Sequence, residues 1–286
     1  GRVINTGTQA PKSASGYDLT RLFIGSEGTL GLITEIKLKL YGQPASIKSA
    51  SCVFENISDA VQTVILAIQS GIQLARVELL DEVQMQGMNN YNKDLSFPEK
   101  PHLFIEFHGS ELSTTEQVED FKSISDEFGA YDFKWATKTE DRNRLWKARH
   151  DAYWAGKSLW PQASSLVTDC CVPISSLASC ILKTKEAINE SDLLAPLVGH
   201  VGDGNYHLLI LFDGTTRDGL KRAKELAGRV NEIALSFGGT ITGEHGVGTG
   251  KKNFMYLEHG KSWNLMGDIK KLFDPKNIMN PGKLVP

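Results

Sequence analysis

The spacing of hydrophobic and polar residues changes period repeatedly along the chain, from two to about three and a half. Short segments of alternating or continuous apolar residues predict strands at 33–40, 46–54, 74–81, 102–109, 131–137 and 165–173. Longer amphipathic segments predict helices at 59–71, 82–91, 113–128, 140–157, 175–189 and 216–237, with a last helix ending at Phe273. The two kinds of segment alternate, which indicates a domain that mixes helices and strands.

Capping residues support several of the predicted helix ends. Ser58 is placed to cap the first long helix and Gly71 to end it. Ser113 and Glu116 have the spacing of a capping box. A tight hairpin between two of the strands favours an antiparallel sheet. The fold class predicted is therefore α+β, an antiparallel sheet covered by helices.

A domain boundary is expected near residue 42. Residues 1–42 are rich in Gly, Ser and Thr, and Gly42-Gln43-Pro44 interrupts the pattern. With 286 residues, the chain is long enough for more than one domain. The first residue is Gly, so we expect the chain to begin inside a longer protein.

Composition and charge narrow the functional classes. The net charge of −3 gives no basic field for nucleic acid. There is no apolar run of about 18 residues, so no transmembrane helix is expected. The four cysteines lack C-x-x-C spacing, which argues against a zinc cage and favours a reducing compartment.

The segment GHVGDGNYHLLI places His200 and His207 symmetrically about Asp203-Gly204. Asp-Gly is a strong signal for a two-residue type I′ hairpin turn. That turn would set His200 directly opposite His207 on one face, at a spacing that suits two ligands of one metal ion. Strand alternation would put Leu209 on the same face. The alternative is a polar hairpin without a ligand.

A candidate for the third ligand is provided by the Gly-rich segment TGEHGVGTGKK. Glu244 with two imidazoles would make a divalent metal site that suits Zn²⁺ or Mn²⁺. His245 is then a candidate general base. The segment fails the phosphate-binding P-loop pattern, because His245 and Lys252 stand where Gly and Ser or Thr are required.

Arg149 is the remaining candidate, because a guanidinium binds a carboxylate through two parallel hydrogen bonds. The alternative is that Arg149 lies on a solvated helix face and binds no substrate.

Four segments together resemble one family of flavoproteins. They are SGYDLTRLFIGSEGTLGLITEIKLKL, GHVGDGNYHLLILF, TGEHGVGTGKK and DPKNIMNPGKLVP. The chain resembles the C-terminal portion of the FAD-dependent D-lactate and D-2-hydroxyacid dehydrogenases, within the vanillyl-alcohol-oxidase superfamily. The resemblance implies that residues 1–42 are the last part of an FAD-binding domain and that residues 43–286 are the substrate, or cap, domain.

The resemblance also implies roles for particular residues. His200, His207 and Glu244 match metal ligands, His245 the active-site histidine, and Arg149 the residue that binds the substrate carboxylate. The residues that would contact FAD are Gly25, Ser26, Glu27, Gly28, Thr29, Ile33 and Asn280. The implied reaction is metal-assisted. The metal chelates the substrate, His245 takes the hydroxyl proton, and a hydride passes from Cα to the flavin.

The substrate is expected to be a small D-2-hydroxy acid, most simply D-lactate. Relatives that oxidise D-2-hydroxyglutarate carry an Asn where this chain has Leu209, and a Lys in the strand that here reads SLVTDCCVP. An apolar pocket would leave a second carboxylate unpaired. Glycolate, D-2-hydroxyglutarate and an inactive metal-binding cap fragment are the alternatives.

The resemblance implies an electron acceptor of the cytochrome c, quinone or electron-transfer-flavoprotein kind. It implies a mitochondrial location in a eukaryote, and a cytoplasmic or peripheral inner-membrane location in a bacterium.

Overall fold

The computed structural model describes residues 1–93, 96–136 and 138–286, which form two compact units. The larger unit is Tyr41–Gly243, and the smaller unit combines Gly1–Leu40 with Glu244–Pro286. The two units are defined by how the chain packs, whereas the predicted domains are defined by the cofactor and the substrate that they would bind. The assignment of residues 1–42 to an FAD-binding domain and 43–286 to a substrate domain therefore stays a prediction.

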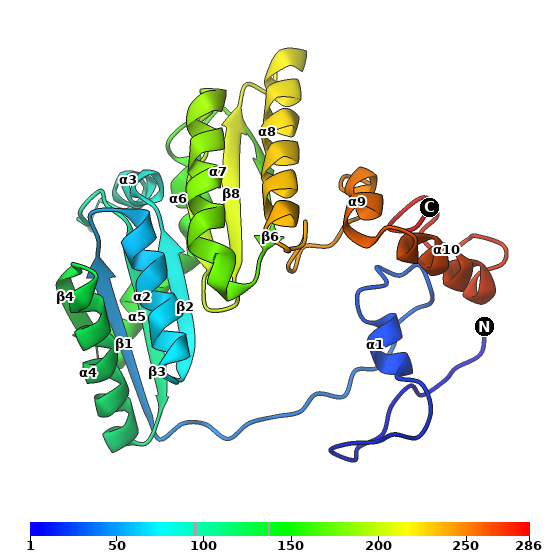
Figure 1. Ribbon diagram of the computed structural model, residues 1–286, viewed down its shortest axis with the longest axis horizontal. Coiled ribbons are helices and arrows are strands. Elements are labelled where there is room, and N and C mark those ends of the chain that lie inside the picture. Colours follow the sequence, from blue (N-terminus) through cyan, green and yellow to red (C-terminus); the bar gives the residue numbers. More distant parts are fainter. Residues whose placement is uncertain (94–95, 137) are drawn as a thin grey trace. The chain divides into compact units, whose positions relative to one another are not determined.

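The larger unit is built on an eight-stranded antiparallel sheet with strand order β4-β1-β3-β2-β7-β8-β5, in which β6 also pairs with β8 (Figure 1). The strands are β1 Ser46–Val53, β2 Leu74–Leu80, β3 His102–Gly109, β4 Tyr131–Ala136, β5 Ser164–Val167, β6 Cys170–Cys171, β7 Leu197–His200 and β8 Asn205–Phe212. The sheet and its flanking helices confirm the predicted α+β class.

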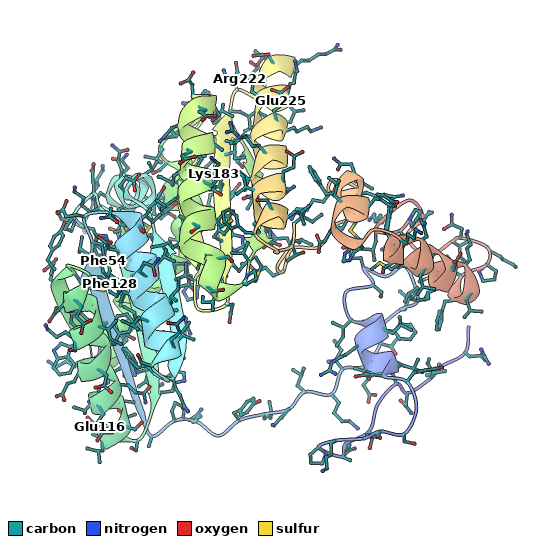
Figure 2. The ribbon with its side chains drawn as sticks, in the orientation of Figure 1. Phe54, Glu116, Phe128, Lys183, Arg222 and Glu225 are labelled. Atoms are coloured by element: carbon teal, nitrogen blue, oxygen red, sulfur yellow. The ribbon has the colours of Figure 1, made fainter. Side chains whose placement is uncertain are left out.

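Four helices cover one face of this sheet (Figure 1). They are α2 Ile57–Gln69, α4 Glu111–Glu127, α7 Leu177–Ser191 and α8 Arg217–Ser236. Alternate residues of β3, namely Leu103, Ile105 and Phe107, are buried under them in the main core. Lys183 on α7 and Arg222 and Glu225 on α8 are exposed on the outer surface of the layer (Figure 2). The four helices are therefore amphipathic, as their sequence periodicity predicts.

Part of the opposite face packs against α3 Glu82–Tyr91, α5 Thr139–His150 and α6 Ala152–Lys157. A second apolar cluster there includes Phe104 of β3 and Trp146 of α5, and the Trp146 indole N–H donates to the Ser49 hydroxyl over 3.1 Å. Polar residues of β2, β7 and β8 also lie on this face. These strands and α5 position the candidate site.

Some predicted element boundaries are wrong. Ser110, rather than Ser113, caps α4, because its hydroxyl accepts from the Ser113 backbone N–H. Asn56 rather than Ser58 caps α2. The helix predicted over 140–157 is divided into α5 and α6 at Asp151, and the strand predicted over 165–173 is divided into β5 and β6. Residue 137, at the end of a predicted strand, lies outside the described residues.

The strand predicted over 33–40 is also wrong. Residues 31–44 have no regular secondary structure, and Ile36, Leu38 and Leu40 are 71%, 74% and 85% exposed. Sheet hydrogen bonds require a neighbouring strand, and the described residues provide none for this segment. The alternating pattern therefore does not by itself produce a strand.

The smaller unit contains α1 Leu19–Phe23, the 3₁₀ helix η2 Lys252–Phe254, α9 Met255–His259 and α10 Ser262–Phe273. The buried Lys270 ammonium donates to the carbonyls of Thr29 and Met279 over 2.8 and 2.6 Å and pairs with Asp274. These contacts connect α10 to the segment GSEGT and to the C-terminal loop.

None of the helices in the described ranges combines the length and the apolar character that crossing a membrane requires.

We expect stability to fall below about pH 6.5 because of His102. Burial lowers the pKa of this imidazole from 6.5 to about 4, and Nδ1 donates to the Lys100 carbonyl over 2.8 Å. Between about pH 6.5 and pH 4 the unfolded chain binds a proton at His102 that the folded chain does not, so the free energy of unfolding decreases as the pH falls. The loss is about 3 kcal/mol.

Denaturant unfolding of the wild type and of His102→Gln at about pH 7 and pH 5 measures this contribution. The wild type should lose more stability than the variant, and an equal loss in the two proteins contradicts the assignment.

Candidate active site

The hairpin between β7 and β8 has a different register from the predicted one. His200 pairs with Asn205 and Val198 with His207, so the connection has four residues rather than two. Gly204 has a φ of +79°, but Asp203 is not in the left-handed region that a type I′ turn requires at both positions. Val201 is fully buried in the main core and is part of the connection, not of the strand pairing that a two-residue turn would give.

The two histidines nevertheless lie on one face. His207 is opposite Val198, and Val198 and His200 are two residues apart on the same strand. Their ring centroids are 5.5 Å apart and the rings are nearly perpendicular. The shared face is thus as predicted, although the pairing is diagonal rather than direct.

Glu78 of β2 connects His200 with Arg149. One carboxylate oxygen, Oε1, is 2.8 Å from His200 Nδ1. The other, Oε2, accepts from Nε and Nη2 of Arg149, each over 2.9 Å. The side chains of Glu78 and Arg149 are 6% and 16% exposed, so the solvated-face interpretation of Arg149 is wrong.

His207 is held by the segment between β5 and β6. Its Nδ1 is 3.2 Å from the Thr168 carbonyl and 3.5 Å from Asp169 Oδ1. The fully buried Asp169 carboxylate also accepts from the Asn205 amide over 2.9 Å and from the Thr242 hydroxyl over 2.7 Å. A carbonyl and a carboxylate only accept, so Nδ1 carries the proton and Nε2 is the ring nitrogen suited to a metal.

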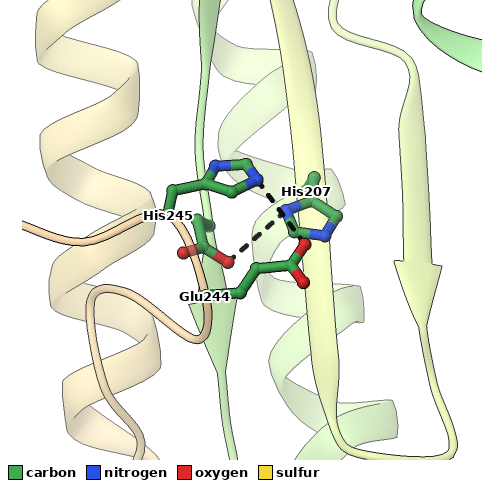
Figure 3. Close-up of side chains that lie close together, drawn as sticks. His207, Glu244 and His245 are labelled. Carbon is green, nitrogen blue, oxygen red and sulfur yellow. Dashed lines mark ion pairs between the residues drawn. The ribbon is translucent and has the colours of Figure 1, made fainter. Parts of the chain in front are cut away.

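Glu244 and His245 are consecutive residues of the loop after Gly243, and Glu244 Oε1 is 3.5 Å from His245 Nε2 (Figure 3). Their side chains are 52% and 45% exposed. Asp169, His207, Glu244 and His245 make up a group among the described residues that could hold a metal ion. This group contains the predicted ligands His207 and Glu244, adds Asp169 and His245, and does not include His200.

The chemistry of these donors fits a divalent cation. Imidazole nitrogens and carboxylate oxygens are ligands of Zn²⁺ and Mn²⁺, and the carbonyl of Thr168 gives His207 the outer hydrogen bond typical of metal-bound histidines. Asn205, on the same face of β8 as His207, has a buried Oδ1 that no described residue satisfies. A water or a cation would satisfy that oxygen.

Cys171 is a poor ligand by comparison. Burial, together with the charges of Asp203 and Asp169, raises the pKa of its thiol, and metals bind the thiolate.

Leu209 lies two residues after His207 on the same face and is 7% exposed, in a small apolar cluster with Ala163 and Leu211.

The predicted FAD-contacting segment lies in the smaller unit. Gly25 has a φ of +79°, and a Cβ added to it would meet no atom within 4 Å. An open glycine backbone fits the close approach of a cofactor. The Glu27 carboxylate accepts from the backbone N–H groups of Val247 and Gly248 over 2.6 and 2.8 Å, and the Asn280 amide donates to the Glu27 carbonyl. Ser26 and Thr29 are buried in the same turn, whereas Ile33 is 58% exposed.

Glu78, Asp169 and Asn205 are not among the functional residues predicted from the sequence. Glu78 interrupts the apolar part of β2 in the segment RVELL, and a charged residue there indicates a polar position on one face. Asp169 and Asn205 carry no comparable signal, because their importance depends on contacts between distant parts of the chain.

Solved structures with a similar fold include, by their titles, a 4-ethylphenol oxidase, a p-cresol methylhydroxylase and an alkyldihydroxyacetonephosphate synthase. A p-cresol methylhydroxylase with substrate bound matches with a TM-score of 0.69 at 15% identity, over 96% of this chain and 60% of that chain. An alkyldihydroxyacetonephosphate synthase matches with a TM-score of 0.65 at 19% identity, over 98% of this chain and 52% of that chain. At these identities the likeness shows the fold alone.

The sequence defines the family more closely. Residues 43–284 match the family model of FAD linked oxidases, C-terminal domain, and the chain belongs to that family. It is 44% identical to a probable mitochondrial D-lactate dehydrogenase of Danio rerio, over 100% of this chain and 58% of that protein. It is 45% identical to a mitochondrial D-lactate dehydrogenase [cytochrome] of Arabidopsis thaliana, over 100% of this chain and 50% of that protein.

A glycolate oxidase subunit GlcD of Bacillus subtilis is 35% identical, over 99% of this chain and 60% of that protein. The chain thus spans between half and three fifths of the length of these curated relatives.

Proposed function

We propose that the protein oxidises a small D-2-hydroxy acid, most simply D-lactate to pyruvate, with FAD and a divalent metal as cofactors. The observation that carries the proposal is the polar face of the sheet, where Arg149, Glu78, His200 and His207 follow one another in contact. An arginine connected through Glu78 to two histidines, inside a family of FAD-linked oxidases, suits a substrate that has a carboxylate next to a hydroxyl group.

The proposed metal ligands are His200, His207 and Glu244. His207 is supported by the Thr168 carbonyl at Nδ1, and His200 by the Glu78 carboxylate at Nδ1. Glu244 follows Gly243, whose N–H donates to the Asp169 carbonyl over 3.3 Å. Because consecutive Cα atoms are about 3.8 Å apart, chain connectivity keeps the Glu244 backbone near Asp169. Asp169 has its oxygens engaged by Asn205 and Thr242, which suits orienting His207.

The reaction follows from these roles. Arg149 binds the substrate carboxylate. Its guanidinium has five N–H donors and Glu78 accepts from two of its nitrogens, so Arg149 can contact Glu78 and a substrate at the same time. A divalent cation would lower the pKa of the substrate hydroxyl. His245 accepts the hydroxyl proton at Nε2, beside Glu244, whose charge stabilises the resulting imidazolium. FAD, when bound, would accept the Cα hydrogen together with its bonding electron pair, which leaves the 2-oxo acid.

Leu209 supports a monocarboxylic substrate. It presents an apolar side chain on the face that carries His207, and an unpaired second carboxylate on apolar surface is costly.

The curated mitochondrial relatives point to a cytochrome-type acceptor and a mitochondrial location. The glycolate oxidase subunit keeps glycolate as a second candidate substrate.

The test is a substrate panel on the full-length protein. Flavin absorbance and product formation are followed with D-lactate, L-lactate, glycolate and D-2-hydroxyglutarate, with cytochrome c as acceptor. We expect D-lactate to have the highest kcat/KM and to give pyruvate. A preference for the dicarboxylate contradicts the role of Leu209, and a flavin that none of these acids reduces contradicts the proposed function.

A further inference from the structure

The carboxylate of Glu78 is buried at a position where the strand would accept an apolar residue. Its neighbours in sequence, Val77 and Leu79, are in the main core, and Leu80, on the same face as Glu78, is in the second apolar cluster. The cross-strand partner of Glu78 is Phe104, which is fully buried. A carboxylate among such neighbours loses hydration, and well-packed apolar residues often stabilise a core as well as a buried ion pair does.

Both oxygens of this carboxylate are engaged by residues of the proposed site. Oε2 accepts from Nε and Nη2 of Arg149 on α5, and Oε1 is 2.8 Å from Nδ1 of His200 on β7. One side chain of β2 thus holds two functional groups that are 51 positions apart in the sequence.

The contact with His200 determines which ring nitrogen faces a metal. A carboxylate has no proton to give, so Nδ1 must donate and Nε2 carries the lone pair. Outer carboxylates of this kind orient metal-bound histidines and make them more basic. The contact with Arg149 has the same effect on the guanidinium plane, since two N–H groups on one edge are held by a single oxygen.

We infer that Glu78 is a positioning residue that sets the substrate-binding arginine and a metal-binding histidine relative to each other. The inference rests on the proposed function and deepens it. The substrate carries its carboxylate and hydroxyl on adjacent carbons, so Arg149 and the metal must stand at one separation to bind both. Through its two oxygens Glu78 determines that separation.

The matched control is Glu106 on the neighbouring strand β3. The side chains of Glu106 and Glu78 are 9% and 6% exposed, and both lie on the sheet face away from the four-helix layer. The Glu106 carboxylate pairs with Arg76 and His108, over 3.7 and 2.9 Å, and not with Arg149 or His200. Loss of a buried charge of the same kind can therefore be separated from loss of the contacts that the inference requires.

The experiment compares Glu78→Gln and Glu106→Gln in the full-length protein. Zn²⁺ and Mn²⁺ dissociation constants are measured by calorimetry on metal-stripped protein, KM and kcat with D-lactate, and Tm by thermal unfolding. We expect Glu78→Gln to weaken metal binding by about tenfold or more, and to raise KM by more than it lowers kcat. Glu106→Gln should change Tm but neither the metal dissociation constant nor KM.

Four results would overturn the inference or its basis. The inference is overturned if Glu78→Gln binds metal and substrate as the wild type does. It is also overturned if Glu106→Gln loses metal and substrate binding as much as Glu78→Gln does. If Glu78→Gln does not fold, Glu78→Asp is used instead, because it keeps the charge but has a shorter side chain. Wild-type values of KM and of the metal dissociation constant in Glu78→Asp would contradict the inference. A wild type that binds no metal overturns instead the proposed function on which the inference rests.

Discussion

His207→Ala should abolish turnover while FAD remains bound. His207 is 6% exposed and lies within β8, with Nδ1 held by the Thr168 carbonyl, so its imidazole is fixed in place, as the proposed ligand role requires. Loss of a Lewis acid costs several kcal/mol of transition-state stabilisation, and we expect kcat/KM for D-lactate to fall by at least about 10³-fold. The predicted FAD-contacting residues are in the other unit, so flavin absorbance should not change.

His108→Ala is the control for this substitution. His108 is a histidine of β3 that pairs with Glu106 over 2.9 Å and has a side chain that is 41% exposed. It should retain wild-type turnover. Loss of flavin in His207→Ala would indicate a folding role for His207, and unchanged kcat/KM would remove it from the active site.

Arg149→Lys should raise the KM for D-lactate strongly and change kcat less. A lysine provides a point charge in place of a planar fork, so it cannot bind Glu78 and a substrate carboxylate with the same geometry. The hydrogen bonds of a charged pair contribute about 1.5–3 kcal/mol, which predicts a rise in KM of roughly tenfold to a hundredfold.

Steady-state kinetics of Arg149→Lys and Arg76→Lys test this expectation. Arg76 lies 4.2 Å from the Trp146 centroid and pairs with the buried Glu106, so like Arg149 it is an arginine paired with a buried glutamate. KM should rise only in Arg149→Lys. An unchanged KM in that variant would assign Arg149 a structural role beside Glu78.

Much of the fold can be predicted from the sequence because apolar runs indicate the buried strands and amphipathic periods indicate the helices that cover them. The strand at 102–109 matches β3 throughout, and the helix at 216–237 matches α8 with Thr216 as its cap. The failures occur where a partner decides the structure. Residues 33–40 have the pattern of a strand without a partner strand among the described residues, and Ser113 has the sequence of a cap although Ser110 has the geometry.

The candidate site is predictable in its residue types but not in its contacts. Alternation along β7 and β8 places His200 and His207 on one face although the connection has four residues rather than the predicted two, because a shift of register by an even number of residues preserves the face. Glu78 and Asp169 are different. Each acts through a contact between distant parts of the chain, 71 positions to Arg149 in one case and 73 to Thr242 in the other, which local pattern cannot supply.

The metal content of the full-length protein tests the central claim most directly. Elemental analysis of the purified wild type should find about one Zn or Mn per chain, as a site of two histidines and one carboxylate requires. The same analysis of the His200→Ala/His207→Ala double variant should find none. A wild type without metal, or a double variant that retains it, would contradict a metal-assisted oxidation at this face of the sheet.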